Sequence, residues 1–503
     1  MTKNNVSKSS INNATYNIPE ILNDKKAIDL FLEANKNKKV IAVQGLGFVG
    51  AVMSLVCANA LNEEYAVIGV DLPTIESFWK ICSINEGIFP IISADKKVEE
   101  YFESAKKKNN FYATYDAYAF SKADIVIVDI NLDVQKQSHH IFSNQTVNYS
   151  VDLNGFKSAM KSIGDVCKED ALILIETTVP PGTTELAKSI IQESLQARNL
   201  VIDQIKIGHS YERVMPGPNY IDSIQNFYRV YSGINSYSAD HVEAFLKTII
   251  RIDEYPLTRL KNTNSTEMSK VLENSFRAMN IAFIVEWSRY AEEAGVDLYE
   301  VVNAIRMRPT HKNIMLPGLG VGGYCLTKDP LLASWSKQYL IGNNHPLPMS
   351  ESAVTTNDKM PLYAYQLFKS FFNESNPCKN VYLLGVSYAP DVGDTRYSPV
   401  ELFFKLLNED ECKIYLNDPY VHFWEELEQV VSDDFEKLTN SLDAIIFTTG
   451  HSLYKNNKRM INLILELDHL LIFDTVGILN EQEILELSQK HTVKVLGRGE
   501  MRK

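Results

Sequence analysis

One segment near the start of the chain constrains the fold more than any other, because it joins a strand, a glycine-rich turn, a helix and a second strand in direct succession. An apolar strand is predicted over residues 39–44, and the sequence Gly-Leu-Gly-Phe-Val-Gly follows it at 45–50. A helix of small residues is predicted over 51–61, and a strand over 66–70 leads to Asp71. This is the dinucleotide-binding fingerprint in the structural context that it requires. It predicts a parallel sheet with helices on both faces.

The small and polar positions of this segment suit a bound dinucleotide. Gly45 permits a tight turn, Gly47 lets the backbone approach a pyrophosphate, and Gly50 allows the helix to pack closely on the strand. The N-terminus of the helix faces the phosphates. Asp71 is expected to accept hydrogen bonds from the adenosine ribose, which favours NAD over NADP because a 2′-phosphate would be repelled. The alternative is a tight strand–helix turn that holds no ligand.

Strands and helices continue to alternate along the rest of the chain. Three further strands of the first sheet are predicted at 123–130, 171–175 and 205–208. The pattern restarts after a proline-rich stretch, with strands at 381–386, 413–416, 444–448 and 470–473 and no second glycine fingerprint. We therefore predict an α/β fold with two Rossmann-like doubly wound domains.

Polar segments follow several of these strands, where the ligands of open α/β sheets bind. In the first domain, Thr177 and Thr178 are expected to meet the nicotinamide half of the cofactor, although a threonine-capped helix explains the segment equally well. Glu212 and Arg213 follow the next strand as either an acid/base group with its charged neighbour or a surface ion pair. In the second domain, residues 387–396, 418–419 and 448–451 form a comparable set, suited to a second ligand or else to dimerisation alone.

A long helix is predicted over residues 265–294, with Gly295 as its stop signal. Lys270, Asn274 and Arg277 occupy positions i, i+4 and i+7, which places them on one face. Such a line is usually solvated, but a helix that connects two domains often borders a site. We expect Lys270 and Asn274 to donate hydrogen bonds to developing negative charge.

A glycine-rich stretch at residues 317–330 contains a single cysteine, Cys325, where a helix is expected to begin. The positive end of a helix lowers a thiol pKa and raises the thiolate fraction. Asp329 lies four residues further on, so one helical turn would bring its carboxylate beside the sulfur. A nucleophilic thiol with an acid/base partner suits a covalent adduct with a carbonyl. The alternative is a packed, unreactive cysteine.

Composition limits the functional classes and the compartment. A net charge of −13 argues against general affinity for nucleic acid. The six cysteines are scattered, which predicts neither a disulfide framework nor a zinc site and fits a reducing compartment. Residues 1–38 are polar and do not read as a signal peptide, and no apolar run approaches the roughly 20 residues that span a bilayer. We expect a cytoplasmic protein that needs no metal and no membrane.

Taken together, these segments resemble the UDP-glucose/GDP-mannose dehydrogenase family, the nucleotide-sugar 6-dehydrogenases. The resemblance covers nearly the whole chain after residue 38 and rests on six features in the family's order. They are GLGFVG at 45–50, ETTVPPGTT at 176–184, YERVMPG at 211–217, the spacing of Lys270 and Asn274, GVGGYCLTKDP at 320–330 and PDVGDTR at 390–396.

The resemblance implies a domain organisation. It comprises a polar N-terminal arm at 1–38, an NAD-binding Rossmann domain at 39–262, a central helical dimerisation domain with the cysteine loop at 263–375, and a UDP-sugar-binding Rossmann-like domain at 376–503. It also implies a homodimer or a higher homo-oligomer.

The resemblance further implies the chemistry, in which the C6 alcohol of a UDP-sugar is oxidised to a carboxylate with two NAD for surface polysaccharide synthesis. Cys325 would carry the thiohemiacetal and then the thioester. The implied catalytic residues are Cys325, Lys270, Asn274, Asp329 and Glu212. The implied cofactor-binding residues are Gly45, Gly47, Phe48, Val49, Gly50, Asp71, Thr177, Thr178 and Lys328. The implied substrate-binding residues are Arg213, Arg277, Arg308 (with Arg306 as the other choice), Gly322, Tyr324 and Arg396.

Three positions depart from the family's pattern. The usual Val-Pro-Thr-Pro segment is replaced at residues 129–133, where Asn131 is the expected substitute for the threonine. Pro216 stands where UDP-glucose enzymes carry a second glutamate, and with Arg213 it favours UDP-N-acetylhexosamines over UDP-glucose. Ala389 replaces a lysine that often precedes Pro-Asp in the nucleotide loop, which removes one expected phosphate contact.

Two other functions stay open at this point. A two-electron dehydrogenase of the hydroxyacid type would share the glycine turn and a helix lysine but would not need Cys325. A non-catalytic family member that binds NAD or a nucleotide is compatible with the altered segment at 129–133. The number of NADH formed per sugar separates these possibilities.

Overall fold

The computed structural model describes residues 5–214, 217–435 and 441–499. The chain forms two compact units, and each is built on one sheet. The first unit takes Met1–Asp133, Val151–Val271 and Trp335–His345, and the second takes Val134–Ser150, Leu272–Ser334 and Pro346–Lys503. The four-part domain division expected from the sequence stays a prediction.

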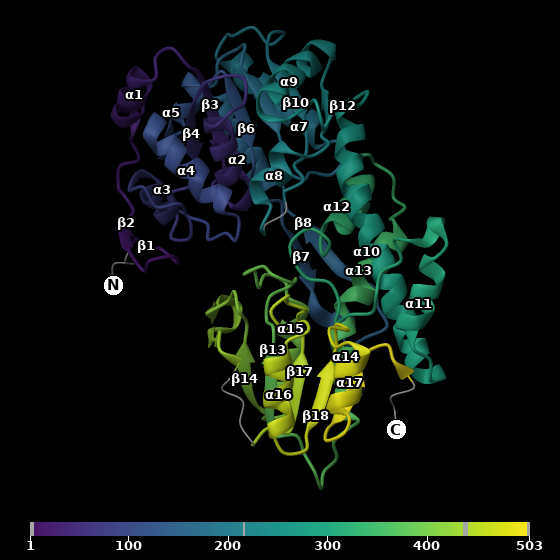
Figure 1. The fold of residues 1–503 in the computed structure, drawn as a ribbon. Helices are drawn as coiled ribbons and strands as arrows, with labels where there is room; N and C mark the ends of the chain where they lie inside the picture. The colour runs from purple at the N-terminus through teal and green to yellow at the C-terminus, as the bar shows by residue number, and fades with distance from the viewer. Residues whose placement is uncertain (1–4, 215–216, 436–440, 500–503) are drawn as a thin grey trace. The chain divides into compact units, whose positions relative to one another are not determined.

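The sheet of the first unit has eight strands in the order β12-β11-β10-β9-β6-β3-β4-β5 (Figure 1). The six parallel strands are β3 (Lys39–Gln44), β4 (Tyr65–Val70), β5 (Phe111–Thr114), β6 (Ile125–Val128), β9 (Leu172–Ile175) and β10 (Lys206–His209), and β11 (Val230–Gly233) and β12 (Thr258–Arg259) extend the sheet. The strand order reverses between β3 and β6, which is the position where doubly wound sheets bind dinucleotides. The doubly wound fold is confirmed.

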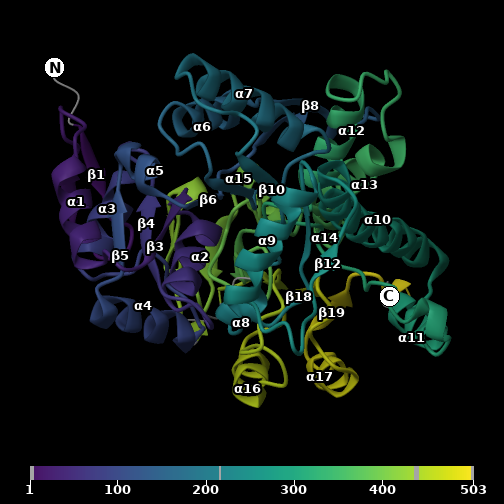
Figure 2. The same ribbon diagram turned by 90° about the horizontal axis from the view of Figure 1, so that it is seen from above.

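Helices cover both faces of this sheet because its central strands are buried on both sides. In β3, Ile41 and Val43 enter one core and Ala42 enters the other. The first core is covered by α2 (Phe48–Ala58), α3 (Phe78–Asn85), α4 (Lys96–Lys108), α8 (Tyr220–Gln225) and α9 (Ser236–Ile249). The second is covered by α1 (Lys25–Ala34), α5 (Tyr118–Lys122), α6 (Asn154–Gly164) and α7 (Thr183–Ala197). Figure 2 shows α2 and α4 on the side of the sheet opposite to α6 and α7.

The second unit contains a smaller, fully parallel sheet in the order β14-β13-β17-β18-β19. Its strands are β13 (Asn380–Leu384), β14 (Lys413–Asn417), β17 (Ala444–Phe447), β18 (Leu471–Asp474) and β19 (Thr492–Val495). One face packs on α14 (Met360–Lys369) and α15 (Pro399–Glu409), and the other on α16 (Lys458–Glu466) and α17 (Glu481–Leu487). The order reverses between β13 and β17, so a second ligand edge lies there.

The predicted long helix is α10 (Thr263–Ala294), and it ends before Gly295, whose φ is +69°. It is followed by α11 (Leu298–Arg306), α12 (Asp329–Tyr339) and α13 (Pro348–Asp358). No helix in the described part of the chain is both long and apolar enough to cross a membrane.

Three two-stranded hairpins of the described residues were absent from the sequence expectations, and one of them, formed by β15 (Phe423–Trp424) and β16 (Gln429–Val430), lies in the second unit. Strands β1 (Val6–Lys8) and β2 (Thr15–Asn17) pair in the N-terminal arm, and α1 follows them from Lys25. Strands β7 (Val134–Gln137) and β8 (Asn148–Val151) leave the first sheet, and their hairpin packs in the second unit against α13. Its contacts include Tyr149 Oη to Glu351 Oε1 at 2.8 Å. Such short polar strands carry no apolar alternation, so they give no local signal.

Candidate active site

The glycine turn has the geometry that a dinucleotide needs. Gly45 has φ +98°, and a Cβ there would lie 2.2 Å from the Asp129 carbonyl oxygen. A Cβ at Gly50 would lie 2.0 Å from the Gly45 carbonyl oxygen, whereas a Cβ at Gly47 would meet nothing within 4 Å. Gly45 and Gly50 are therefore needed for packing, and the open side of Gly47 is free for a phosphate to approach the start of α2 at Phe48 and Val49.

Asp71 connects this turn to the loop beyond β4. Its carboxylate accepts hydrogen bonds from Leu46 N at 3.0 Å and from Leu72 N at 2.8 Å. Burial raises the pKa of the Asp71 carboxyl, with Lys80 and the two N–H groups acting against that rise. The carboxylate keeps lone pairs for the hydroxyls of a ribose, so the residues present fit the adenosine half of NAD.

The threonines after β9 differ in what they contact. Thr177 Oγ1 donates to Val128 O at 3.0 Å and accepts from Ile130 N at 2.9 Å, so this hydroxyl joins β6 to β9. Thr178 is half-buried at the same edge.

The start of α7 is capped by a residue that sequence reasoning missed. Glu267 of α10 accepts from Gly182 N at 2.8 Å and from Thr184 N at 2.6 Å.

Two acidic side chains, Asp129 and Glu176, form a short row across the carboxyl edge of the first sheet. Val128 of β6 is paired with Gln44 and Ile175, so the next residue of each strand brings Gly45, Asp129 and Glu176 side by side. Asp129 lies on the same face as Ile125 and Ile127, and both of its carboxylate oxygens are buried without a hydrogen-bond partner among the described residues. Asn131, the expected substitute, is exposed.

One buried guanidinium, that of Arg229, forms an ion pair within this acidic row. Arg229 lies immediately before β11 and pairs with Glu176. Burial, followed by the charge of Glu176, raises the pKa of Asp129 well above its usual range. Burial raises the pKa of Glu176 to about 7, although Arg229 opposes the rise. At least one of these carboxyls therefore carries a proton near neutral pH.

Replacing Asp129 with Asn tests this protonation through stability. Glu176 binds more protons in the folded than in the unfolded protein between about pH 4.5 and pH 7, and the raised pKa of Asp129 acts in the same direction, so stability falls as the pH rises. We expect Asp129→Asn to stabilise the protein at pH 8 by about 1–3 kcal/mol, because an unpaired buried carboxylate is lost, and by less at pH 5. Thermal unfolding at both pH values measures this. The exposed neighbour Asp133→Asn is the control. A loss of stability at pH 8 would contradict the assignment.

Glu212 and Lys270, predicted from separate motifs, meet in the first unit. Lys270 Nζ donates to the Glu212 carbonyl oxygen at 3.0 Å and lies 3.6 Å from Glu212 Oε1. Both residues are buried. Arg213 stacks over the rings of Tyr211 and Phe227, with its Cζ 5.6 Å and 5.3 Å from their centroids. The expectation for Pro216 lies outside the described residues.

Cys325, Asp329 and Asn274 meet in the second unit. Cys325 is the exposed member of the six cysteines, and it lies one turn before α12, which begins at Asp329 rather than at the cysteine. Asp329 N donates to the Cys325 carbonyl oxygen at 2.9 Å. The fully buried Asp329 carboxylate accepts from Asn274 Nδ2 at 2.5 Å and from Lys328 Nζ at 2.8 Å. A carboxyl group fixed by two hydrogen bonds thus lies one turn from an accessible thiol.

The cysteine loop packs on the loop that follows β13. A Cβ at Gly322 would lie 2.6 Å from Tyr388 Cβ, and Gly323 N donates to the Arg396 carbonyl oxygen at 3.1 Å. The Tyr324 ring has Lys328 Nζ at 4.5 Å and Arg396 Cζ at 5.9 Å from its centroid. The predicted phosphate loop and the predicted nucleophile therefore lie against each other within this unit.

Two predicted arginines lie at the surface of the second unit. Arg277 of α10 and Arg308 are exposed. Arg306, the other choice for the second role, donates from Nε to the Ile314 carbonyl oxygen at 3.0 Å. This contact leaves Arg308 as the better candidate of the pair. The described residues contain no group of three or more His, Cys, Asp or Glu side chains placed to hold a metal ion.

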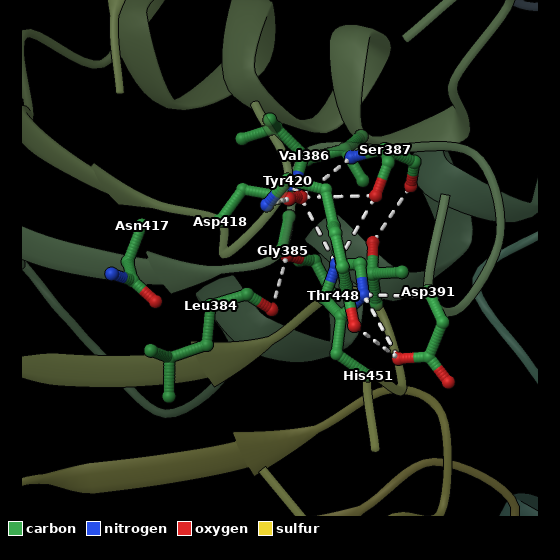
Figure 3. A network of polar contacts seen from close by, with 12 residues as sticks. Leu384, Gly385, Val386, Ser387, Asp391, Asn417, Asp418, Tyr420, Thr448 and His451 are labelled. Carbon is green, nitrogen blue, oxygen red and sulfur yellow. Dashed lines mark hydrogen bonds and ion pairs between the residues drawn. The ribbon is translucent and has the colours of Figure 1, made fainter. Parts of the chain in front are cut away.

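The three strand ends of the second sheet converge on one buried aspartate (Figure 3). Asp418 Oδ2 accepts from Ser387 Oγ at 2.9 Å and lies 3.0 Å from His451 Nε2. Asp391 N donates to His451 Nδ1 at 3.0 Å, so this ring nitrogen carries no proton and the other one donates to Asp418. The serine hydroxyl is occupied, so the group is a support for loop 387–396 and not a hydrolytic triad.

Comparison with known proteins gives one consistent result. Three models of the UDP-glucose/GDP-mannose dehydrogenase family match the chain, namely the NAD-binding domain at residues 39–252, the central domain at 264–359 and the UDP-binding domain at 382–481. A UDP-N-acetyl-D-mannosamine dehydrogenase of Pyrococcus horikoshii is 29% identical over 83% of this chain and 90% of its own length. The corresponding enzyme of Methanococcus aeolicus is 28% identical over 93% and 98%.

Solved structures agree with these matches. The structure of a UDP-D-ManNAc dehydrogenase from Pyrococcus horikoshii superposes with a TM-score of 0.75 at 26% identity, covering 92% of this chain and all of that one. An NDP-N-acetyl-D-galactosaminuronic acid dehydrogenase from Methanosarcina mazei gives a TM-score of 0.74 at 24% identity, over 95% and 99%, which supports the fold alone.

Proposed function

This chain belongs to the UDP-glucose/GDP-mannose dehydrogenase family and is an NAD-dependent dehydrogenase, and from this premise we propose that it oxidises the C6 alcohol of a UDP-N-acetylhexosamine to the uronic acid. The names of the relatives make UDP-N-acetylmannosamine the first sugar to assay, with UDP-glucose as the comparison. The observation that carries the proposal is the exposed Cys325 one turn before the buried, doubly hydrogen-bonded Asp329. The product would serve surface polysaccharide synthesis.

The proposed reaction removes four electrons through one thiol. NAD, when bound, would supply one two-electron oxidation, so two NAD would be consumed for each sugar. The first oxidation converts the alcohol to an aldehyde, to which the Cys325 thiolate adds to form a thiohemiacetal. Loss of a second hydride gives a thioester. Water then attacks this carbonyl, releases the carboxylate and returns the thiol.

The buried polar residues suit the charges that form in these steps. The alkoxides of the thiohemiacetal and of thioester hydrolysis need donors, and we assign Lys270 and Asn274, one turn apart on α10, to that role. Glu212, which lies against Lys270, is assigned as the base for the attacking water. Asp329 accepts hydrogen bonds from Lys328 and Asn274, so its position is fixed and it is suited to orient water or to receive the thiol proton.

The remaining predicted residues are assigned to substrate binding in this proposal. Loop 387–396, which lies on the second sheet's ligand edge, would hold the uridine nucleotide with Arg396. Tyr324, Gly322, Arg277 and Arg213 are assigned to the sugar and its phosphates. Arg308 would complete the substrate site of a second copy of the chain.

A homodimer through α10 is part of the proposal. The helix exposes large apolar side chains at spacings of three, four and seven residues, which place them on one face. They are Leu272, Phe276, Phe283, Trp287 and Tyr290. An exposed apolar face of this length favours a second copy of the chain as its partner.

The number of NADH formed per sugar tests the proposed function. Complete conversion of a limiting amount of UDP-N-acetylmannosamine is expected to give two NADH and the uronic acid, without free aldehyde. One NADH per sugar would instead indicate the two-electron hydroxyacid type of dehydrogenase. Absence of NADH from a panel of UDP-sugars, with NAD binding intact, would indicate a non-catalytic member of the family.

A further inference from the structure

The N-terminal arm contacts the part of the first unit where the adenosine end of NAD is expected. The hairpin of β1 and β2 pairs Ser7 with Tyr16 and packs on α3 (Figure 1). Ile18, just after β2, joins the same core as Phe78 and Ile81 of α3. Tyr16 Oη donates to Glu86 Oε2 at 2.7 Å. The arm, expected from its composition to be only a polar extension, is built into the Rossmann unit.

Ser7 makes the central contact of this arm. It is 0% exposed, which is unusual for a serine in a polar segment. Its hydroxyl donates to Ile75 O at 2.6 Å and accepts from Trp79 N at 3.0 Å. These two groups lie at the end of the loop after β4 and at the start of α3. One buried hydroxyl therefore fixes both sides of the junction between that loop and that helix.

The loop fixed by Ser7 follows directly on the predicted ribose-binding carboxylate. Asp71 accepts from Leu72 N, and Ser77 Oγ donates to Leu72 O at 2.5 Å, so the loop is closed on itself. Two large apolar side chains of this loop, Leu72 and Ile75, are exposed. Apolar side chains beside a ribose-binding acid are suited to pack on the flat face of an adenine ring.

We propose that the N-terminal hairpin is a positioning element for the adenosine half of NAD, with Ser7 holding the loop at residues 72–77 so that Leu72 and Ile75 contact the adenine. When the hydroxyl is present, the loop is ordered before the cofactor arrives, and binding does not have to supply the cost of ordering it. This role requires only that the protein binds NAD and does not depend on the sugar oxidation proposed above.

Binding of the two halves of the cofactor tests this role. Ser7→Ala is expected to weaken ADP-ribose and NAD about fivefold to tenfold, equal to about 1–1.4 kcal/mol, and to leave nicotinamide mononucleotide unchanged. In turnover, KM for NAD should rise by the same factor while kcat at saturating NAD stays constant. Titration calorimetry with the full-length protein measures the affinities.

The hairpin supplies a matched control. Ser9 is 1% exposed, and its hydroxyl accepts from Ile11 N and Asn12 N within the hairpin turn. Because these contacts stay inside the hairpin, Ser9→Ala should leave the affinity for ADP-ribose within twofold. Ile75→Ser changes an exposed side chain and should weaken ADP-ribose without altering thermal unfolding. The proposal is overturned if Ile75→Ser binds ADP-ribose normally, or if Ser9→Ala weakens it as much as Ser7→Ala does.

Discussion

Cys325→Ser should reduce steady-state NADH formation from the UDP-sugar by at least about 10³-fold, because removal of a catalytic nucleophile has effects of this size or larger. A serine hydroxyl at neutral pH is a far weaker nucleophile than a thiolate, so the aldehyde would not be captured and the second hydride would not leave. NAD affinity, measured by titration, should stay unchanged, because the glycine turn at Gly45 and Gly50 belongs to the first unit.

Cys82→Ser is the matched control for this variant. Cys82 is half-buried in α3, and burial raises the pKa of its thiol to about 11, so it is unreactive at neutral pH. We expect the Cys82 variant to retain turnover. Alkylation of the wild type should abolish activity when Cys325 alone is modified, and peptide masses identify the modified cysteine. Turnover by Cys325→Ser within tenfold of the wild type would exclude covalent capture.

Lys494→Met should lower the melting temperature by about 10 °C, the equivalent of roughly 3–5 kcal/mol for a buried charge left without its partner. Lys494 and Glu292 are both 0% exposed, with Lys494 Nζ 2.6 Å from Glu292 Oε2. Glu292 Oε1 also accepts from Gly497 N at 2.7 Å, so this pair joins α10 to the last strand of the second sheet.

A double variant separates loss of the charge from loss of packing. Glu292→Gln keeps an acceptor for Gly497 N and removes the charge that Lys494→Met leaves unpaired. The combination should therefore recover most of the lost stability, since a neutral pair of similar volume is often nearly as stable as a buried ion pair. Thermal unfolding of the four proteins gives the coupling. Equal instability of the single and double variants would contradict the charge argument.

The elements that sequence reasoning placed correctly have local causes. The succession of β3, the glycine turn, α2 and β4 follows from apolar runs and from glycines that the turn needs sterically. The end of α10 at Ala294 follows from Gly295, which adopts φ +69°. The family resemblance, carried by motifs of which four follow strands, was confirmed by the matches to all three family models.

The features that were missed depend on contacts between distant parts of the chain. Glu267 caps α7 from a helix more than 80 residues later in the sequence, and no local pattern indicates such a partner. Asp129 was treated as part of an altered loop, yet it continues the alternation of Ile125 and Ile127 onto the core face. Ser7 is buried against α3 and the loop before it, about 70 residues later in the sequence. The roles given to Cys325 and the other site residues stay predictions.

The path of the chain between the two units has a consequence for its synthesis. The first unit is complete only when Trp335–His345 has been made, and the second needs the hairpin at Val134–Ser150 that precedes most of its residues. Each unit therefore becomes complete only after segments of the other unit have also left the ribosomal exit tunnel. No single cut of the chain yields two fragments that hold one complete unit each, because the first unit ends at His345 and the second begins at Val134.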